Sequence, residues 1–165
     1  MELGLEPEIY RERLRLDTWT TIALGLLICA LTPLAALQLF ASSCEPLLAW
    51  LYGGLDLFFV AIYLNFRALD VSITGSDVRV AFGFIRKTVH VEDIASVEPV
   101  ITSFGMYGGY GIRFGGDDSL AFTVSYGDGV RIRMKRGRPF VFTTENRGRV
   151  LELLNGLIRP AEDHG

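Results

Sequence analysis

The stretch from Trp19 to Ala41 reads WTTIALGLLICALTPLAALQLFA, and none of its 23 residues is charged. A second stretch, from Pro46 to Leu64, reads PLLAWLYGGLDLFFVAIYL and holds a single charge, Asp56. A helix rises about 1.5 Å per residue, so each stretch is long enough to cross a hydrocarbon core of about 30 Å. Only residues 42–45 separate the two stretches. The sequence therefore predicts a membrane α-helical hairpin at 18–64, with spans at 19–41 and 46–64.

The composition of the whole chain agrees with a membrane component. Half of the 165 residues are hydrophobic, which is high for a soluble domain. A cleaved signal peptide is the alternative for the first span. The leader, residues 1–17, carries five acidic residues where a signal peptide would be basic, so we expect the span to be retained.

The basic residues near the ends of the spans predict the orientation. Arg11, Arg13 and Arg15 precede the first span and Arg67 follows the second, whereas the turn between them has no base. Because bases favour the cytoplasmic side, we expect a multi-pass protein of the cell (inner) membrane with both termini in the cytoplasm.

From Leu69 the hydrophobic pattern changes to a period of two residues, which is typical of β-strands. A short polar segment, Gly75-Ser76-Asp77, separates the first two strands as a hairpin turn. We also expect Asp128-Gly129 to form a turn. Near the end, RGRVLELLNGLI carries apolar residues at helical spacing, and Pro160 follows it. The predicted strands are LDVSIT, VRVAFGF, KTVHV, ASVEPVIT, GIRF, LAFTVSY, GVRIRMK and PFVFTTE.

The segment 105–118, GMYGGYGIRFGGDD, raises the question of a phosphate-binding loop. A dinucleotide fingerprint would need a third glycine where Phe114 stands, and the following Asp117 and Asp118 would repel phosphate. No helical pattern follows to provide free N–H groups. We therefore expect structural glycines that allow positive φ and close backbone contact, with a backbone-lined ligand groove as the alternative. Tyr107 and Tyr110 would then be wall or rim aromatics.

The order of strands followed by one terminal amphipathic helix resembles small prokaryotic two-helix membrane proteins with a cytoplasmic bacterial PH-like (bPH) domain. The pieces that carry the resemblance are LDVSITGSDVRVAFG, VHVEDIASVEPV, YGGYGIRF and GDGVRIRMKRGRPFVFTTE, with the final helix. The resemblance implies a mainly-β PH-like barrel at 69–159 with a C-terminal helix, followed by a tail at 160–165. Phosphoinositide-binding PH domains place bases in the first hairpin loop, and Gly75-Ser76-Asp77 has none.

Asp56 is the most unusual residue of the spans, because a charge at that depth costs at least about 2.5 kcal/mol. We expect it to be protonated or paired, and the depth of the hairpin makes Thr32 its candidate partner. One interpretation is a hydrogen bond between helices or between subunits. The other is a proton or ion relay in a membrane enzyme or a transport-accessory subunit.

Alternating bases on one strand are the candidates for binding lipid headgroups or other anions. Arg131, Arg133 and Lys135 share one strand face, and Arg136 and Arg138 extend the patch. Anionic headgroups could attract each nearby base by about 1 kcal/mol. The alternative is a solvated strand face, because twelve bases from Asp70 onward are balanced by twelve acids. The same balance argues against nucleic acid.

No catalytic residue, metal site or cofactor is expected. His90 and His164 are the only histidines, and no Cys/His spacing fits a metal. The function we expect is a binding or scaffolding module anchored in the lipid bilayer, with an anionic lipid headgroup or a protein segment as its partner. A second copy of the chain is a further candidate partner.

Overall fold

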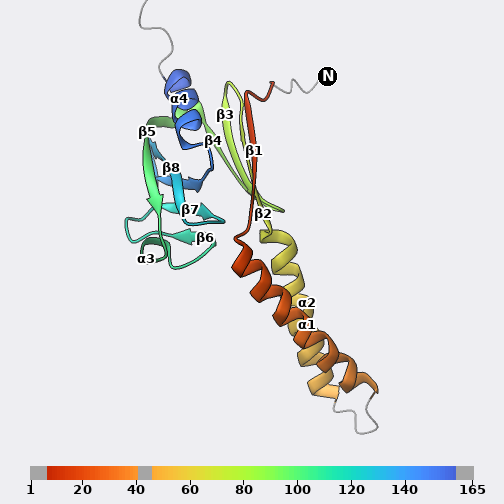
Figure 1. Ribbon diagram of the computed structural model, residues 1–165. Helices are drawn as coiled ribbons and strands as arrows, with labels where there is room; N and C mark the ends of the chain where they lie inside the picture. The colour runs from red at the N-terminus through yellow and green to blue at the C-terminus, as the bar shows by residue number, and fades with distance from the viewer. Residues whose placement is uncertain (1–6, 41–45, 159–165) are drawn as a thin grey trace, which may run out of the picture. The chain divides into compact units, whose positions relative to one another are not determined.

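The computed structural model describes residues 7–40 and 46–158, which form two compact units (Figure 1). We call Leu16–Arg67 the helical unit. The β unit combines the described residues up to Arg15 with those from Ala68 onward. The predicted turn at 42–45 and the tail at 160–165 lie outside the described residues, as does the start of the leader.

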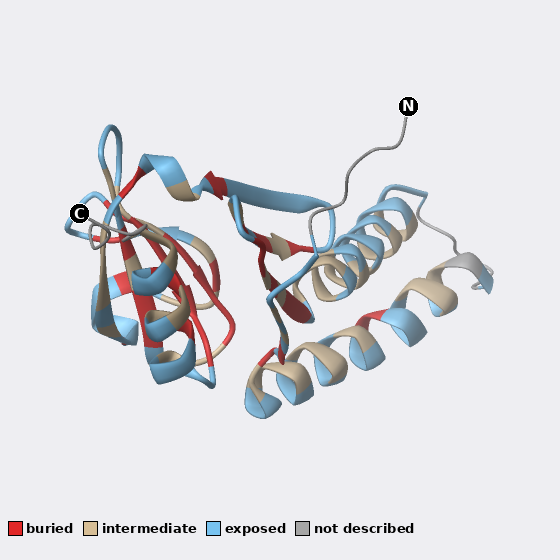
Figure 2. Ribbon diagram, turned by 90° about the horizontal axis from the view of Figure 1, so that it is seen from above, coloured by how far each residue is buried: buried red, intermediate tan, exposed pale blue. Residues whose placement is uncertain are grey.

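The helical unit consists of α1 (Thr18–Phe40) and α2 (Pro46–Phe66), which pack against each other. Asp17 caps α1, because its Oδ2 accepts hydrogen bonds from the backbone N–H groups of Trp19 and Thr20 at 3.1 and 3.3 Å. Both helices are long and apolar enough to cross a membrane, by length and composition. Their side chains are mainly exposed or half-buried (Figure 2). The prediction of two long apolar helices is confirmed.

The first sheet of the β unit is antiparallel and has four strands in chain order. Alternation explains why these segments become strands: in β3, Val78, Val80 and Phe82 are fully buried while the residues between them face outward. The strands are β1 (Tyr10–Arg15), β2 (Ala68–Ile73), β3 (Asp77–Phe82) and β4 (Ile85–His90).

The second sheet has five strands in the order β5-β8-β9-β7-β6, and its one parallel pair is β7 with β9. The 3₁₀ helix η1 (Val91–Asp93) connects the first sheet to the second, and a short helix, α3 (Phe104–Tyr107), follows β5. The chain ends in α4 (Arg147–Ile158). The strands are β5 (Ile94–Thr102), β6 (Gly111–Phe114), β7 (Leu120–Thr123), β8 (Gly127–Met134) and β9 (Phe140–Thr143).

Aromatic rings join the two sheets in the core of the β unit. Phe82 of β3 stacks on Phe122 of β7 with ring centroids 5.6 Å apart, and Phe122 meets Phe140 of β9 edge-on at 5.3 Å. Val150 and Leu154 of α4 are fully buried. The buried residues of the chain therefore concentrate on the sheets and on one face of α4, as Figure 2 shows.

All eight strands predicted from the sequence are present, with each end within three residues of its predicted position, and the terminal helix has the predicted bounds. The predicted barrel is not confirmed, because the described strands form two sheets and no closed barrel. The turn predicted at Asp128-Gly129 is wrong. Those residues lie inside β8, and the chain bends at 124–126 instead.

The strand β1, Tyr10–Arg15, was not predicted from the sequence. These residues pair antiparallel with Ala68–Ile73, on the far side of the helical unit in sequence. Their signal is the alternation Y-R-E-R-L-R, in which the arginines are exposed and Leu14 is buried. The acidic and basic side chains hide that alternation from a search for apolar residues.

Candidate functional site

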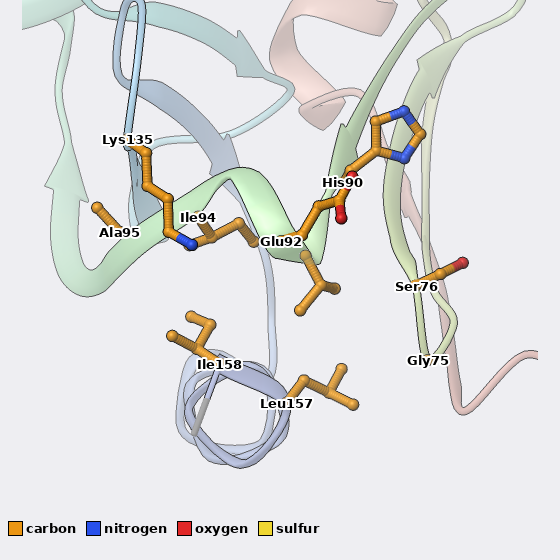
Figure 3. Close-up of a pocket in the computed structure, with 10 residues that line it drawn as sticks. Gly75, Ser76, His90, Glu92, Ile94, Ala95, Lys135, Leu157 and Ile158 are labelled. Atoms are coloured by element: carbon orange, nitrogen blue, oxygen red, sulfur yellow. The ribbon is translucent and has the colours of Figure 1, made fainter. Parts of the chain in front are cut away.

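The β unit contains a groove of about 770 Å³ where η1, the last turn of α4 and the ends of several strands meet. Figure 3 shows Leu157 and Ile158 on the helix, across the groove from Glu92 and Ile94. The lining residues are Gly75, Ser76, His90, Val91, Glu92, Ile94, Ala95, Lys135, Leu157 and Ile158.

Backbone hydrogen bonds hold the walls of this groove together. The N–H of Val91 donates to the carbonyl of Ser76 at 2.8 Å, which ties η1 to the β2–β3 turn. The N–H of Lys135 donates to the carbonyl of Asp93 at 2.8 Å, which ties η1 to the end of β8. These main-chain bonds fix η1 relative to the β2–β3 turn and to the end of β8.

The strand β5 starts at the groove and lies at the edge of its sheet. Its pairing with β8 is irregular between Ile94 and Ser96, and the residue between them, Ala95, is exposed to the groove. Bulges of this kind turn a side chain out of the regular ladder and occur beside binding sites. The outer edge of β5 also presents backbone N–H and C=O groups that no described strand pairs.

The polar groups of the groove carry both signs of charge. Lys135 and Glu92 are in the lining, and His90 stands at the rim with its Nδ1 2.5 Å from Oδ1 of Asp77. Asp77 also accepts from Arg79 at 3.3 Å, so its carboxylate is held by two partners on the same hairpin. A lining of aliphatic side chains with mixed charges suits a peptide segment better than a compact anion.

The structure places the five predicted anion-binding bases differently from one another. Arg131 pairs with Asp117, and its side chain is only 20% exposed. Arg133 pairs with Glu98 at 2.8 Å. The side chains expected to point outward are therefore largely engaged by carboxylates of the same unit. Of the remaining bases, Arg138 pairs with Asp118 at 3.1 Å, Lys135 lines the groove, and Arg136 is exposed.

Asp56 and Thr32 are brought together in the helical unit. The Thr32 Oγ1 lies 3.2 Å from Asp56 Oδ2 and 2.9 Å from the carbonyl of Ile28. The contact predicted from the depth of the hairpin is thus present. The other oxygen, Asp56 Oδ1, is shielded and has no hydrogen-bond partner among the described residues.

The glycine segment is structural in the way that its spacing predicts. Gly108, Gly109 and Gly111 all have positive φ, and Gly108 ends α3 with its N–H 2.6 Å from the carbonyl of Phe104. Tyr107 is buried against Ala121 and is a core residue rather than a rim residue.

The turn that follows this segment is built around Asp117. Its Oδ1 accepts from the hydroxyl and the N–H of Ser119, at 2.6 and 3.2 Å. These bonds, with a smaller contribution from the Arg131 guanidinium, hold the pKa of Asp117 below its usual value. The two carboxylates predicted to repel phosphate are thus both paired with arginines, Asp117 with Arg131 and Asp118 with Arg138.

One hydrogen-bond network was not predicted from the sequence, and it centres on the carboxylate of Glu12 in β1. Its Oε2 accepts from the hydroxyl of Thr144 at 2.6 Å and from the hydroxyl of Tyr10 at 3.0 Å, and its Oε1 accepts from the N–H of Glu145 at 2.8 Å. Burial, together with the neighbouring Glu12 carboxylate, raises the pKa of Tyr10. This network joins β1 to the residues that precede α4.

Within the described ranges, no group of three or more His, Cys, Asp or Glu side chains could hold a metal ion. No protein-family model, no curated protein and no solved structure matches this chain.

Proposed function

We propose that this is an integral membrane protein whose β unit is a cytoplasmic binding module for an extended protein segment. The membrane part rests on the two apolar helices. Trp19, Phe40 and Trp50 are 78%, 88% and 81% exposed, and Leu57 is 70% exposed, so the protein itself leaves large apolar side chains uncovered. In a membrane, the lipid acyl chains would cover these side chains and keep them out of contact with water.

The observation that carries the binding role is the groove at the start of β5. An extended segment could add a strand to the edge of β5 there while it places an apolar side chain between Ile94 and Leu157. Pro99 lacks an N–H and lies in the second half of β5. Pairing is therefore favoured along the first half, beside the groove.

The relation to bacterial PH-like domains is part of the same proposal. Support comes from the order of the elements, which is a series of antiparallel strands followed by one helix whose buried face packs on the second sheet. In such an architecture, the space between the terminal helix and a neighbouring strand edge is a natural peptide site.

Site-specific photo-crosslinking in cells tests the proposed function. A photoreactive amino acid replaces Ala95, in the groove, or Gly116, an exposed turn residue with no neighbouring atom within 4 Å of an added Cβ. We expect a discrete protein adduct from position 95, absent at position 116 and lost with Leu157→Glu. Equal adducts from both positions, or an adduct that is insensitive to Leu157→Glu, would contradict the groove as the site.

A further inference from the structure

The most exposed large hydrophobic residue of the described chain is Phe84, at 93%. It stands in the two-residue turn Gly83-Phe84 between β3 and β4, and the next residue, Ile85, is 44% exposed. Most of the Phe84 surface and nearly half of the Ile85 surface are therefore in contact with solvent, which is unfavourable for apolar side chains.

The register of the first sheet shows which end of the sheet carries this tip. Leu69 pairs with Phe82, and Phe82 pairs with Ile85, so the turn lies at the end where β2 begins. Arg67 is the only residue between the end of α2 and the start of β2. Arg15, at the end of β1, pairs with Ala68 at that same end. Both covalent connections to the helical unit therefore leave from the sheet end that carries Phe84.

The strand spacing gives the distance of the tip from the start of β2. Strands lie about 4.8 Å apart, so the β3–β4 turn, which lies one to two strand spacings from β2, is about 5 to 10 Å from the strand that continues α2. The β2–β3 turn at Gly75-Ser76 lies at the opposite end, about 20 Å away along six residues.

The charges at this end fit an anionic surface. Arg86 and Lys87 follow the tip and are exposed, and Arg15 and Arg67 flank the connections to the helices. The acids near this end are already engaged, since Asp17 caps α1 and Asp70 lies 3.5 Å from Arg13. Bases beside exposed aromatic and aliphatic side chains are typical of segments that lie in the headgroup region.

We propose that the β3–β4 tip, Phe84 and Ile85 with Arg86 and Lys87, inserts into the headgroup region of the membrane that the two helices span. This proposal rests on the proposed membrane anchoring of α1 and α2. The tip then acts as a further attachment point of the β unit to the lipid surface.

Tryptophan fluorescence of the full chain in vesicles with brominated acyl chains tests this. The native chain serves first, because quenching of Trp19 and Trp50 reports whether the helices enter the bilayer. Phe84→Trp is then made as the only tryptophan, in a Trp19→Phe, Trp50→Phe background. Ser76→Trp in the same background is the matched control, because Ser76 is an exposed turn residue at the other end of the same sheet.

We expect quenching and a blue shift at position 84 and neither at position 76. With anionic lipid at low salt, Arg86→Glu with Lys87→Glu should reduce the quenching at position 84, whereas neutral vesicles should show a smaller effect. Circular dichroism of each variant checks that the sheets are intact.

Three results would overturn the proposal, and they are distinguishable. In the first, the native tryptophans are quenched but the emission at positions 84 and 76 is equal and unquenched. This result would support the membrane anchor and refute the inserted tip. A blue shift at position 84 without lipid quenching would assign the tip to a protein contact instead. Unquenched native tryptophans would refute the membrane anchor, and the inserted tip with it.

Discussion

The Thr32 hydroxyl has one hydrogen and two acceptors within reach, the carbonyl of Ile28 at 2.9 Å and Asp56 Oδ2 at 3.2 Å. A serine or threonine in a helix commonly donates to the carbonyl four residues earlier, which would leave its oxygen as an acceptor for Asp56. A side chain that can donate a hydrogen bond at position 56 would then satisfy both groups.

The first prediction follows from this hydrogen-bond count. Asp56→Asn should keep the pairing of α1 and α2, because an amide N–H can donate to Thr32. Asp56→Leu should weaken it by roughly 0.6–2 kcal/mol, the range of hydrogen bonds between membrane helices. Thermal unfolding of the full chain in detergent measures both. If Asn is as destabilising as Leu, an amide cannot replace the carboxyl group in this contact, which contradicts the prediction. If both variants lose a cellular phenotype while the pairing of α1 and α2 is unchanged, the relay interpretation gains weight.

Asp117 is the residue for which a dependence on pH can be predicted. Its folded-state pKa lies below the unfolded value of 3.8, so its contribution to stability is complete above that pH and is lost as the pH falls through the folded value. Asp117→Asn should therefore lower the free energy of unfolding at pH 7 by about 1 kcal/mol, since the group is partly screened by solvent. Unfolding curves at pH 7 and pH 3 should show this difference shrinking at the lower pH. A difference that is independent of pH would show that the carboxylate charge is not involved.

At the scale of elements, β1 is the least expected part of the sheet and depends on one acidic side chain. Glu12 accepts hydrogen bonds from Tyr10, Thr144 and Glu145, and Thr144 is only 3% exposed. Removing this carboxylate leaves a buried hydroxyl and a backbone N–H without their acceptor.

Glu8, another acidic residue of the leader, provides the control for a test of the Glu12 network. We predict that Glu12→Ala lowers the free energy of unfolding of the β unit by about 1.5–3 kcal/mol, as expected for hydrogen bonds to a charged group. Glu8→Ala should change it by less than about 0.5 kcal/mol, because Glu8 forms only an exposed pair with Arg11. Denaturant titration followed by tyrosine fluorescence and circular dichroism compares the two. Equal effects would mean that β1 is held by its ladder alone.

At the scale of the whole molecule, the orientation in the membrane is the property with the clearest test. Bases flank the outer ends of the two helices, at Arg15 and Arg67, and the β unit connects to both helices at those ends. With the β unit in the cytoplasm, the turn between the helices faces the other side.

Cysteine labelling in intact cells measures this orientation. In a Cys29→Ser background, Cys44 should react with a maleimide that cannot cross the membrane. Ser76→Cys, made together with Cys44→Ser, should react only after the cells are lysed, because it lies in the β unit. The reverse pattern would invert the orientation and would place the groove outside the cell.

The sequence alone was enough for the elements whose side chains report their own environment. In DVRVAF, buried apolar side chains alternate with more exposed ones, and in FVFT all four residues are buried. Both patterns can be read from the apolar residues of the segment alone. The same holds for α1, α2 and α4, where length and helical spacing are properties of one segment. The hydrogen bond of Thr32 with Asp56 could also be predicted from the sequence. In an antiparallel hairpin of two helices, the position of a residue in the chain gives its depth in the membrane, and residues at equal depth lie side by side.

Only the tertiary structure decided which segments meet. The pairing of β1 with β2 across the helical unit, the parallel pair β7–β9 and the partners of Arg131 and Arg133 join residues that are far apart in the chain. The groove likewise collects residues from Gly75 to Ile158, and the local sequence does not show that they meet. The physical reason is that hydrophobic periodicity depends on the backbone geometry of one segment, whereas pairing, charge compensation and grooves depend on the packing of several segments against each other.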